Sequence, residues 1–202
     1  MCMQKGCNKM THDSFLMRSV GRDLFLRHME RRDVGDVLRI ENESYDQPWA
    51  KNKFVLAMRK TGTVGQVVEG EGEILGYVIY AEHRPGTFPM QTLSAGGIEV
   101  LNLTIAEKIR RNGLGAKMIS HLKRELKRGR SEHLDSILEL SMIVGDDALD
   151  AQLFLHANGL RAVRVLRGLY SSGEDAYLMA WSKFPDLSVP VFRWANRVES
   201  YM

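Results

Sequence analysis

The sequence predicts an α/β layered domain, because strand and helix signals follow one another in mixed order along most of the chain. About seven β-rich runs and about four helical patterns lie between residues 22 and 183, which favours helices packed on a sheet over a sandwich or a bundle. The 202 residues, 44% of them hydrophobic, are enough for one buried core. We therefore expect a single domain over residues 22–183, a flexible leader over 1–21 and a separate tail over 184–202.

The first half of this domain is predicted to form a strand, two helices and a hairpin. Residues 24–29 alternate in the manner of a strand, and Asp33 can cap a helix that follows. Residues 45–49 break that helix, because proline disfavours helical geometry in the residue before it. A second helix follows, and residues 66–82 contain two β-rich runs around a turn.

The second half begins with a long loop over residues 83–96, which contains Pro85, Gly86 and Pro89. Residues 98–105 then form a nearly continuous apolar run, as in a strand that is buried on both faces. An amphipathic helix comes next, in which Leu114, Met118, Leu122 and Leu126 recur every four residues. The remaining expected elements are a strand over 137–141, a helix over 147–157 and strands over 160–167 and 176–181.

Composition narrows the class of protein and of partner. A net charge of +3, from 28 basic and 25 acidic residues, predicts a mixed surface and no nucleic-acid partner. The only cysteines, Cys2 and Cys7, lie in the leader and read as reduced thiols, so we expect no metal site. No run of about 18 apolar residues and no signal sequence is present, which predicts a cytoplasmic protein without a membrane partner.

A glycine-bearing segment, Arg110-Arg111-Asn112-Gly113-Leu114-Gly115, joins the predicted apolar strand to the amphipathic helix. The first N–H groups of a helix are unpaired and carry partial positive charge, so they bind phosphate where side chains leave room. Two glycines provide that room, and the two arginines add charge-assisted donors. An ordinary turn with solvated arginines is the alternative. The segment lacks the third glycine of a dinucleotide fingerprint and the lysine of a P-loop.

The residues Val100 to Ile105, the Arg110 to Gly115 segment and the helix to Leu126 together resemble the acetyl-CoA motif of GNAT acetyltransferases. Similarity extends over most of Asp23 to Trp181, and the most similar group is that of the bacterial ribosomal-protein alanine N-acetyltransferases. The resemblance implies a GNAT fold with a central mixed, mostly antiparallel sheet, and acetyl-CoA as cosubstrate. It implies a role in cofactor binding for ten residues: Leu103, Thr104, Ile105, Arg110, Arg111, Asn112, Gly113, Leu114, Gly115 and Ala116.

Within that set, the resemblance assigns two different tasks. The backbone of Leu103, Thr104 and Ile105 is expected to pair with the pantetheine arm, which a strand that splays next to a bulge would allow. The backbone amides from Arg111 to Ala116 are expected to hold the pyrophosphate.

Acetyl transfer to an amine needs a proton acceptor, and the resemblance implies Glu139 for that role. Glu139 stands in an otherwise apolar strand, where a raised pKa would suit a general base. The alternative is a glutamate on the solvent face or one paired with a nearby arginine. For the proton donor, the resemblance points to a tyrosine position that Leu155 occupies. The neighbouring His156 can substitute or be a surface residue, and the thiolate can also leave toward water.

The acceptor is expected to be a primary amine, most consistently the α-amine of a protein N-terminus. Tyr170 and the run Gly-Glu-Asp-Ala at residues 173–176 resemble the tyrosine-bearing hairpin that contacts the peptide in N-terminal acetyltransferases. Trp49 and Tyr45 stand where the family's first inter-helix loop lines the acceptor groove. A surface aromatic and a core aromatic are the respective alternatives. A small amine, a lysine, or a regulatory module that has lost turnover also stay open, as do a monomer and a homodimer.

Overall fold

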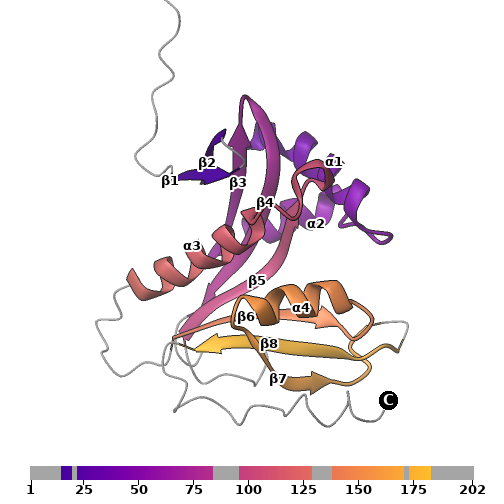
Figure 1. Ribbon diagram of the computed structural model, residues 1–202. Coiled ribbons are helices and arrows are strands. Elements are labelled where there is room, and N and C mark those ends of the chain that lie inside the picture. The colour runs from indigo at the N-terminus through magenta and orange to yellow at the C-terminus, as the bar shows by residue number, and fades with distance from the viewer. Residues whose placement is uncertain (1–14, 20–21, 84–95, 129–137, 171–172, 183–202) are drawn as a thin grey trace, which may run out of the picture.

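The computed structural model describes residues 15–19, 22–83, 96–128, 138–170 and 173–182 (Figure 1). Eight strands in these ranges form one sheet. They are β1 Phe15–Ser19, β2 Arg22–His28, β3 Thr63–Gly70, β4 Glu73–His83, β5 Gly96–Ile105, β6 Leu138–Gly145, β7 Arg161–Leu166 and β8 Ala176–Ser182. The helices are α1 Val34–Ser44, α2 Lys51–Arg59, α3 Leu114–Arg128 and α4 Leu149–Ala157, with short 3-10 turns at Arg31–Asp33 and Glu107–Ile109.

The strands lie in the order β1-β2-β3-β4-β5-β6-β8-β7. All neighbours are antiparallel except β5 and β6, which run parallel. The expected α/β fold with a mixed, mostly antiparallel sheet is therefore confirmed. The eighth strand, β1, lies inside the segment that the sequence analysis assigned to the leader, and it pairs Phe15 with Leu26. The predicted tail and most of the predicted loop over residues 83–96 lie outside the described residues.

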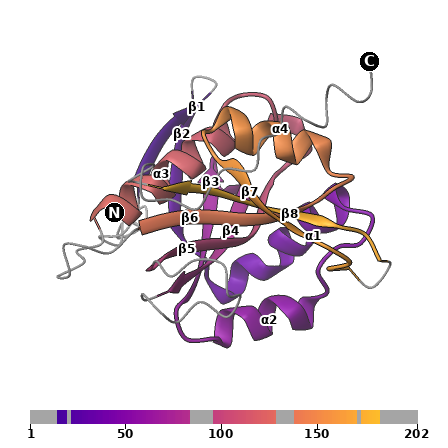
Figure 2. The same cartoon turned by 90° about the horizontal axis from the view of Figure 1, so that it is seen from below.

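Helices cover both faces of the sheet (Figure 2). On one face α3 buries Leu114, Met118, Leu122 and Leu126, the four residues that the sequence pattern assigned to its apolar side, in a core that also takes in Leu155 of α4. On the other face, α1 and α2 pack on β3 and β4 around a second core that includes Ile40, Phe54 and Tyr77. The central strands are thus buried on both sides, as their apolar runs predict.

An irregularity in β5 opens the sheet at its centre. The antiparallel pairing with β4 shifts register there, so that Ile79 faces Asn102, Tyr80 faces Val100, and Leu101 is left over. The parallel pairing with β6 ends at Val100 and Met142, although both strands continue for several residues. The two strands therefore part just beyond a bulge. The backbone of β5 from Leu101 to Ile105 is left without β6 as a pairing partner.

Candidate active site

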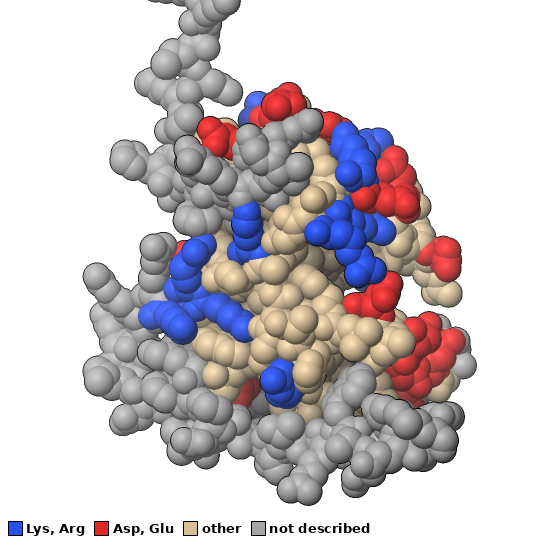
Figure 3. All heavy atoms as spheres, in the orientation of Figure 1, with Lys and Arg blue, Asp and Glu red and all other residues tan. Residues whose placement is uncertain are grey.

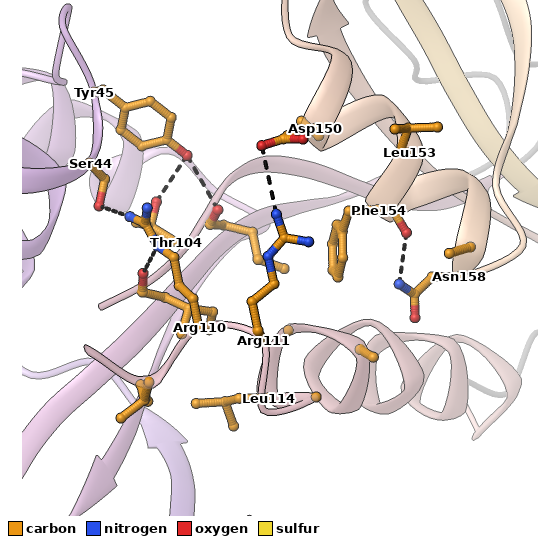
Figure 4. A pocket seen from close by; sticks show the side chains of 18 residues that line it. Ser44, Tyr45, Thr104, Arg110, Arg111, Leu114, Asp150, Leu153, Phe154 and Asn158 are labelled. Atoms are coloured by element: carbon orange, nitrogen blue, oxygen red, sulfur yellow. Dashed lines mark hydrogen bonds and ion pairs between the residues drawn. The ribbon is translucent and has the colours of Figure 1, made fainter. Parts of the chain in front are cut away.

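A cavity of about 690 Å³ lies where β5 and β6 part (Figure 4). The end of α1, the end of β5, the loop before α3, the start of α3 and one side of α4 form its walls. Nine of the ten residues expected to bind the cofactor line it: Leu103, Thr104, Ile105, Arg110, Arg111, Gly113, Leu114, Gly115 and Ala116. The end of β5, the loop after it and the start of α3, which the sequence motif grouped together, thus line one cavity.

The glycines in this loop meet two different demands. Gly113 has a φ of 76°, which side chains other than glycine rarely adopt, and a Cβ there would meet nothing within 4 Å. The space over its backbone is therefore open. Gly115 instead packs against α4, because a Cβ would lie 3.1 Å from Cζ of Phe154, another wall residue of the cavity. An anion at the start of α3 would meet open backbone rather than side chains.

The two arginines of the loop are held differently. The Nε of Arg110 donates to the carbonyl of Ile105 at 2.8 Å, and its guanidinium also donates to Oγ of Ser44 at 2.7 Å, which ties the loop to β5 and α1. The exposed side chain of Arg111 reaches across the cavity toward Asp150, with 3.9 Å between charged atoms (Figure 4). Such a long, solvated ion pair is weak, so Arg111 is the arginine that can turn to a phosphate.

Asn112 differs from the other nine residues, because it does not line the cavity. Its Nδ2 donates to the carbonyls of Ile109 and Arg110, at 3.2 and 3.1 Å. Its side chain shapes the loop, and only its backbone can take part in binding an anion.

A buried hydrogen-bonded network lies behind the α1 wall of the cavity, and sequence reasoning did not find it. Tyr45 of this wall is bonded to Oγ1 of Thr104 at 3.1 Å. Thr104 in turn bonds to the hydroxyl of Tyr77 at 3.2 Å, and Tyr77 donates a short hydrogen bond to Glu41. Burial raises the pKa of Tyr45, and burial together with the hydrogen bond to Glu41 raises that of Tyr77. Both phenols are protonated at neutral pH.

Glu41 anchors this network from α1. Only 1% of its surface is exposed. Its Oε1 accepts from the backbone N–H of Trp49 at 2.8 Å, and both oxygens accept from Nδ2 of Asn102, at 3.2 and 3.3 Å. The signal in the sequence was a glutamate directly after Ile40 on the buried side of a helix. A charge placed there needs partners, which the sequence does not name.

Glu139, the predicted general base, lies at the far end of β6 from the cavity. It pairs with Gly97 of β5, and Leu103 at the cavity comes six residues later, about 20 Å away at ~3.3 Å per residue. Its side chain is 4% exposed, its Oε2 has no hydrogen-bond partner among the described residues, and burial raises its pKa. The row of β6 side chains that includes Glu139 reaches the parting of the strands at Ile143, which cannot accept a proton.

The residue at the expected proton-donor position, Leu155, belongs to the core below α3 and is 1% exposed. His156 is exposed and does not line the cavity. Among the described wall residues, Tyr45 is the phenol. This phenol lines the cavity from the α1 side, opposite α4.

The two residues expected to contact the acceptor also lie outside this cavity. Trp49 packs its ring against Phe54 at 5.4 Å between centroids, with Lys53 above it at 4.3 Å. Tyr170 is 42% exposed and lies at the end of β6, where a Cβ on Gly145 would be 3.7 Å from its ring. Partial burial, and then the carboxylates of Asp147 and Glu174, raise the pKa of Tyr170. It faces solvent close to the parting of the strands.

Within the described ranges, no helix is long and apolar enough to cross a membrane, and no group of three or more His, Cys, Asp or Glu residues could hold a metal. The face seen in Figure 3 carries both basic and acidic side chains, in agreement with the mixed surface expected from composition.

Comparisons with known proteins bear on the fold and on the family. An N-alpha-acetyltransferase of Sulfurisphaera tokodaii is 25% identical over 162 residues, which cover 79% of this chain and 93% of that protein. One of Saccharolobus solfataricus is 23% identical over the same shares. The structure of the ribosomal-protein-S18-alanine N-acetyltransferase from Escherichia coli superposes with a TM-score of 0.61 at 19% identity, covering 79% of this chain and 93% of that one.

Arabidopsis thaliana NAA60 in complex with acetyl-CoA superposes with a TM-score of 0.62 at 14% identity, over 79% of this chain and 98% of that one. At such identities these superpositions bear on the fold. The sequence itself matches the Acetyltransferase (GNAT) family over residues 26–155, from β2 to the buried part of α4. With the cavity, the open glycine loop and the parted strands in place, the chain belongs to the GNAT family of acetyltransferases.

Proposed function

We propose that this acetyltransferase transfers the acetyl group of acetyl-CoA to the α-amine of protein N-termini. The observation that carries the proposal is the cavity between the parted strands, which joins the exposed backbone of β5 to the open start of α3. The archaeal relatives named N-alpha-acetyltransferase support the choice of acceptor, since this chain covers 93% of the first two.

The described residues fit acetyl-CoA, whose thioester supplies the acetyl group. The backbone of Leu103, Thr104 and Ile105 offers donors and acceptors to the pantetheine arm. The open backbone around Gly113 and the first N–H groups of α3 suit the pyrophosphate, with Arg111 free to turn toward it. The apolar walls from α3 and α4 exclude water from the arm between these two ends.

The chemistry of the acceptor favours an α-amine. Its reference pKa of about 7.7–8.0, against about 10.4 for lysine, leaves much more of it uncharged at neutral pH. The exposure of Tyr170 at the end of β6 supports its proposed contact with the residues that follow the amine. Trp49 supports the α1–α2 wall from behind, through its packing on Phe54. The role of Glu139 as base stays a prediction, which a variant tests below.

The experiment follows the release of free thiol from acetyl-CoA with N-terminal peptides, peptides acetylated at the N-terminus that contain lysine, and polyamines. Turnover with free N-termini alone supports the proposal. Preference for lysine or polyamines contradicts it and assigns the alternative acceptors. Stabilisation by acetyl-CoA without turnover on any amine identifies a regulatory module instead.

A further inference from the structure

A chain of hydroxyl groups leads from the cavity to a buried carboxylate. It starts at Tyr45, which is 43% exposed and lines the cavity, and passes through Thr104 and Tyr77, with oxygen–oxygen distances of 3.1 and 3.2 Å. It ends at Glu41, which accepts a short hydrogen bond from Tyr77. Figure 4 shows the outer part of this chain, with the hydroxyl of Tyr45 turned toward the end of β5.

The protons in this chain can all point in one direction. A carboxylate without a proton only accepts hydrogen bonds, so Tyr77 must donate to Glu41. The oxygen of Tyr77 is then available to accept from Thr104. Thr104 has a single proton, and three acceptors lie within reach of it: the hydroxyls of Tyr45 and Tyr77, at 3.1 and 3.2 Å, and Oδ1 of Asn102, at 3.2 Å. In the orientation in which Thr104 donates to Tyr77, its oxygen accepts from Tyr45. The hydroxyl of Tyr45 is left with a lone pair for a donor in the cavity.

The outer end of the chain lies where the reaction is expected to occur. The hydroxyl of Tyr45 is 3.4 Å from the carbonyl oxygen of Leu103, on the stretch of β5 backbone that is expected to hold the pantetheine arm. Glu41 has no such access of its own, since it is 1% exposed. The hydroxyls of Tyr77, Thr104 and Tyr45 link it to the cavity.

We propose that Tyr45, Thr104 and Tyr77 form a proton path that carries the proton of the acceptor amine from the cavity to Glu41. The proposal rests on acetyl transfer to an amine, and not on which amine is the substrate. It places proton acceptance on the α1 side of the cavity rather than on β6.

The transfer balances. As the neutral amine nitrogen bonds to the thioester carbon, its N–H proton passes to the oxygen of Tyr45, whose own proton moves to Thr104. The proton of Thr104 moves to Tyr77, and that of Tyr77 moves to Glu41. The carbon–sulfur bond breaks, and the sulfur leaves with the electron pair and takes a proton from solvent. Each hydroxyl ends with one proton, and the reverse movement returns the proton of Glu41 to solvent after product release.

Four variants test the path by steady-state kinetics. Tyr45→Phe and Thr104→Val each remove one hydroxyl and keep the shape of the side chain. We expect each to lower kcat by about 100-fold, the scale of general acid–base catalysis, while the affinity for acetyl-CoA changes little. Thr104→Ser retains the hydroxyl and should recover most of the loss. The double variant Tyr45→Phe with Thr104→Val should be no slower than either single variant, because both break one path.

A matched control is Tyr80→Phe, which removes a buried hydroxyl from the same strand as Tyr77 but on the face that packs against α3. It should retain wild-type kcat. Thermal unfolding of each variant shows whether it is folded. The path is overturned if Thr104→Val keeps kcat within about threefold of wild type, if Thr104→Ser is as slow as Thr104→Val, or if the losses of the two single variants add.

The choice of acceptor keeps the two proposals separate. Kinetics are measured with the amine that wild type turns over fastest. If that amine is a lysine or a polyamine, the proposed α-amine acceptor is wrong, and the variants still decide on the path. A wild type that turns over no amine overturns both.

Discussion

Glu41 and Glu139 are two glutamates that the fold buries almost completely, yet their surroundings are opposite. Glu41 accepts hydrogen bonds from a tyrosine, an asparagine and a backbone N–H, and a line of hydroxyls connects it to the cavity. Glu139 has an oxygen without a partner among the described residues and lies at the other end of the strand that borders the cavity. Hydrogen bonds stabilise the carboxylate of Glu41 and link it to the cavity, whereas the carboxylate of Glu139 has an unpartnered oxygen and no such link among the described residues.

The difference teaches that burial alone does not identify a general base. Burial raises the pKa of Glu139, which is the property that an acid–base residue needs. A base must also be within hydrogen-bond reach of the proton that it takes, directly or through a relay. Glu41 meets that criterion through Tyr45, which lines the cavity, whereas Glu139 does not line it. Two of the predictions below test these two carboxylates, and two test the cofactor loop and the acceptor contact; they are given in order of decreasing effect.

The largest effect is expected for the stability of Glu41→Gln. The amide nitrogen of glutamine would face groups that already donate, so that at least one buried donor loses its acceptor. We expect the free energy of unfolding to fall by about 3 kcal/mol, the upper range for an unsatisfied buried polar group. Urea unfolding of Glu41→Gln beside Glu139→Gln measures it, and equal stability of the two would break the comparison.

The second effect concerns the cofactor loop, which neither carboxylate touches. In Gly113→Val the branched side chain disfavours a φ of 76° and covers the open backbone. We expect the affinity for acetyl-CoA to fall by about 30-fold, or about 2 kcal/mol. Calorimetry on the folded variant tests this, with Gly72→Val, at a positive-φ turn between β3 and β4, as the control for backbone strain. Wild-type affinity in Gly113→Val would remove the loop from the site.

The third prediction is a dependence of stability on pH that Glu139 causes. Since its pKa is raised in the folded protein, its contribution to stability is fully present below the unfolded pKa and is lost as pH rises through the folded pKa. Glu139→Gln lacks this loss. We therefore expect the stability of the variant relative to wild type to rise as pH increases above the ordinary pKa of a glutamate, about 4.3. Thermal unfolding at a series of pH values measures the difference.

The same variant also decides on the predicted base. If turnover of Glu139→Gln falls about 100-fold while acetyl-CoA binds as before, Glu139 is the base and the comparison is reversed. Turnover close to that of wild type leaves proton acceptance to the α1 side.

The smallest effect is expected for the acceptor. Tyr170 lies beside Gly145, at the end of β6 that is opposite to Glu139. Tyr170→Ala should raise the KM for a peptide acceptor by about threefold, as expected for one partly exposed contact, with the KM for acetyl-CoA unchanged. Leu169→Ala, on the neighbouring exposed residue, is the matched control. An unchanged peptide KM in Tyr170→Ala would place the acceptor elsewhere.

Much of the fold could be predicted because its signals are local. The four-residue repeat of leucine and methionine in α3 and the glycines before it concern neighbours along one helix, and the structure buries that face and opens that loop. The pairing of Phe15 with Leu26 was not visible, because five residues with little pattern become a strand only when a neighbour supplies the hydrogen bonds.

The sequence by itself determined the layered α/β class, the open glycine-bearing start of α3 and the family, since each depends on residue types at short spacing. Only the tertiary structure decided where the carboxylates lie. The strand with Glu139 was expected to end at residue 141 but continues to Gly145, which moves Glu139 away from the parting of the strands. Glu41 meets Tyr77 and Asn102 across 36 and 61 residues. Strand register and long-range packing set such contacts, and no local pattern records them.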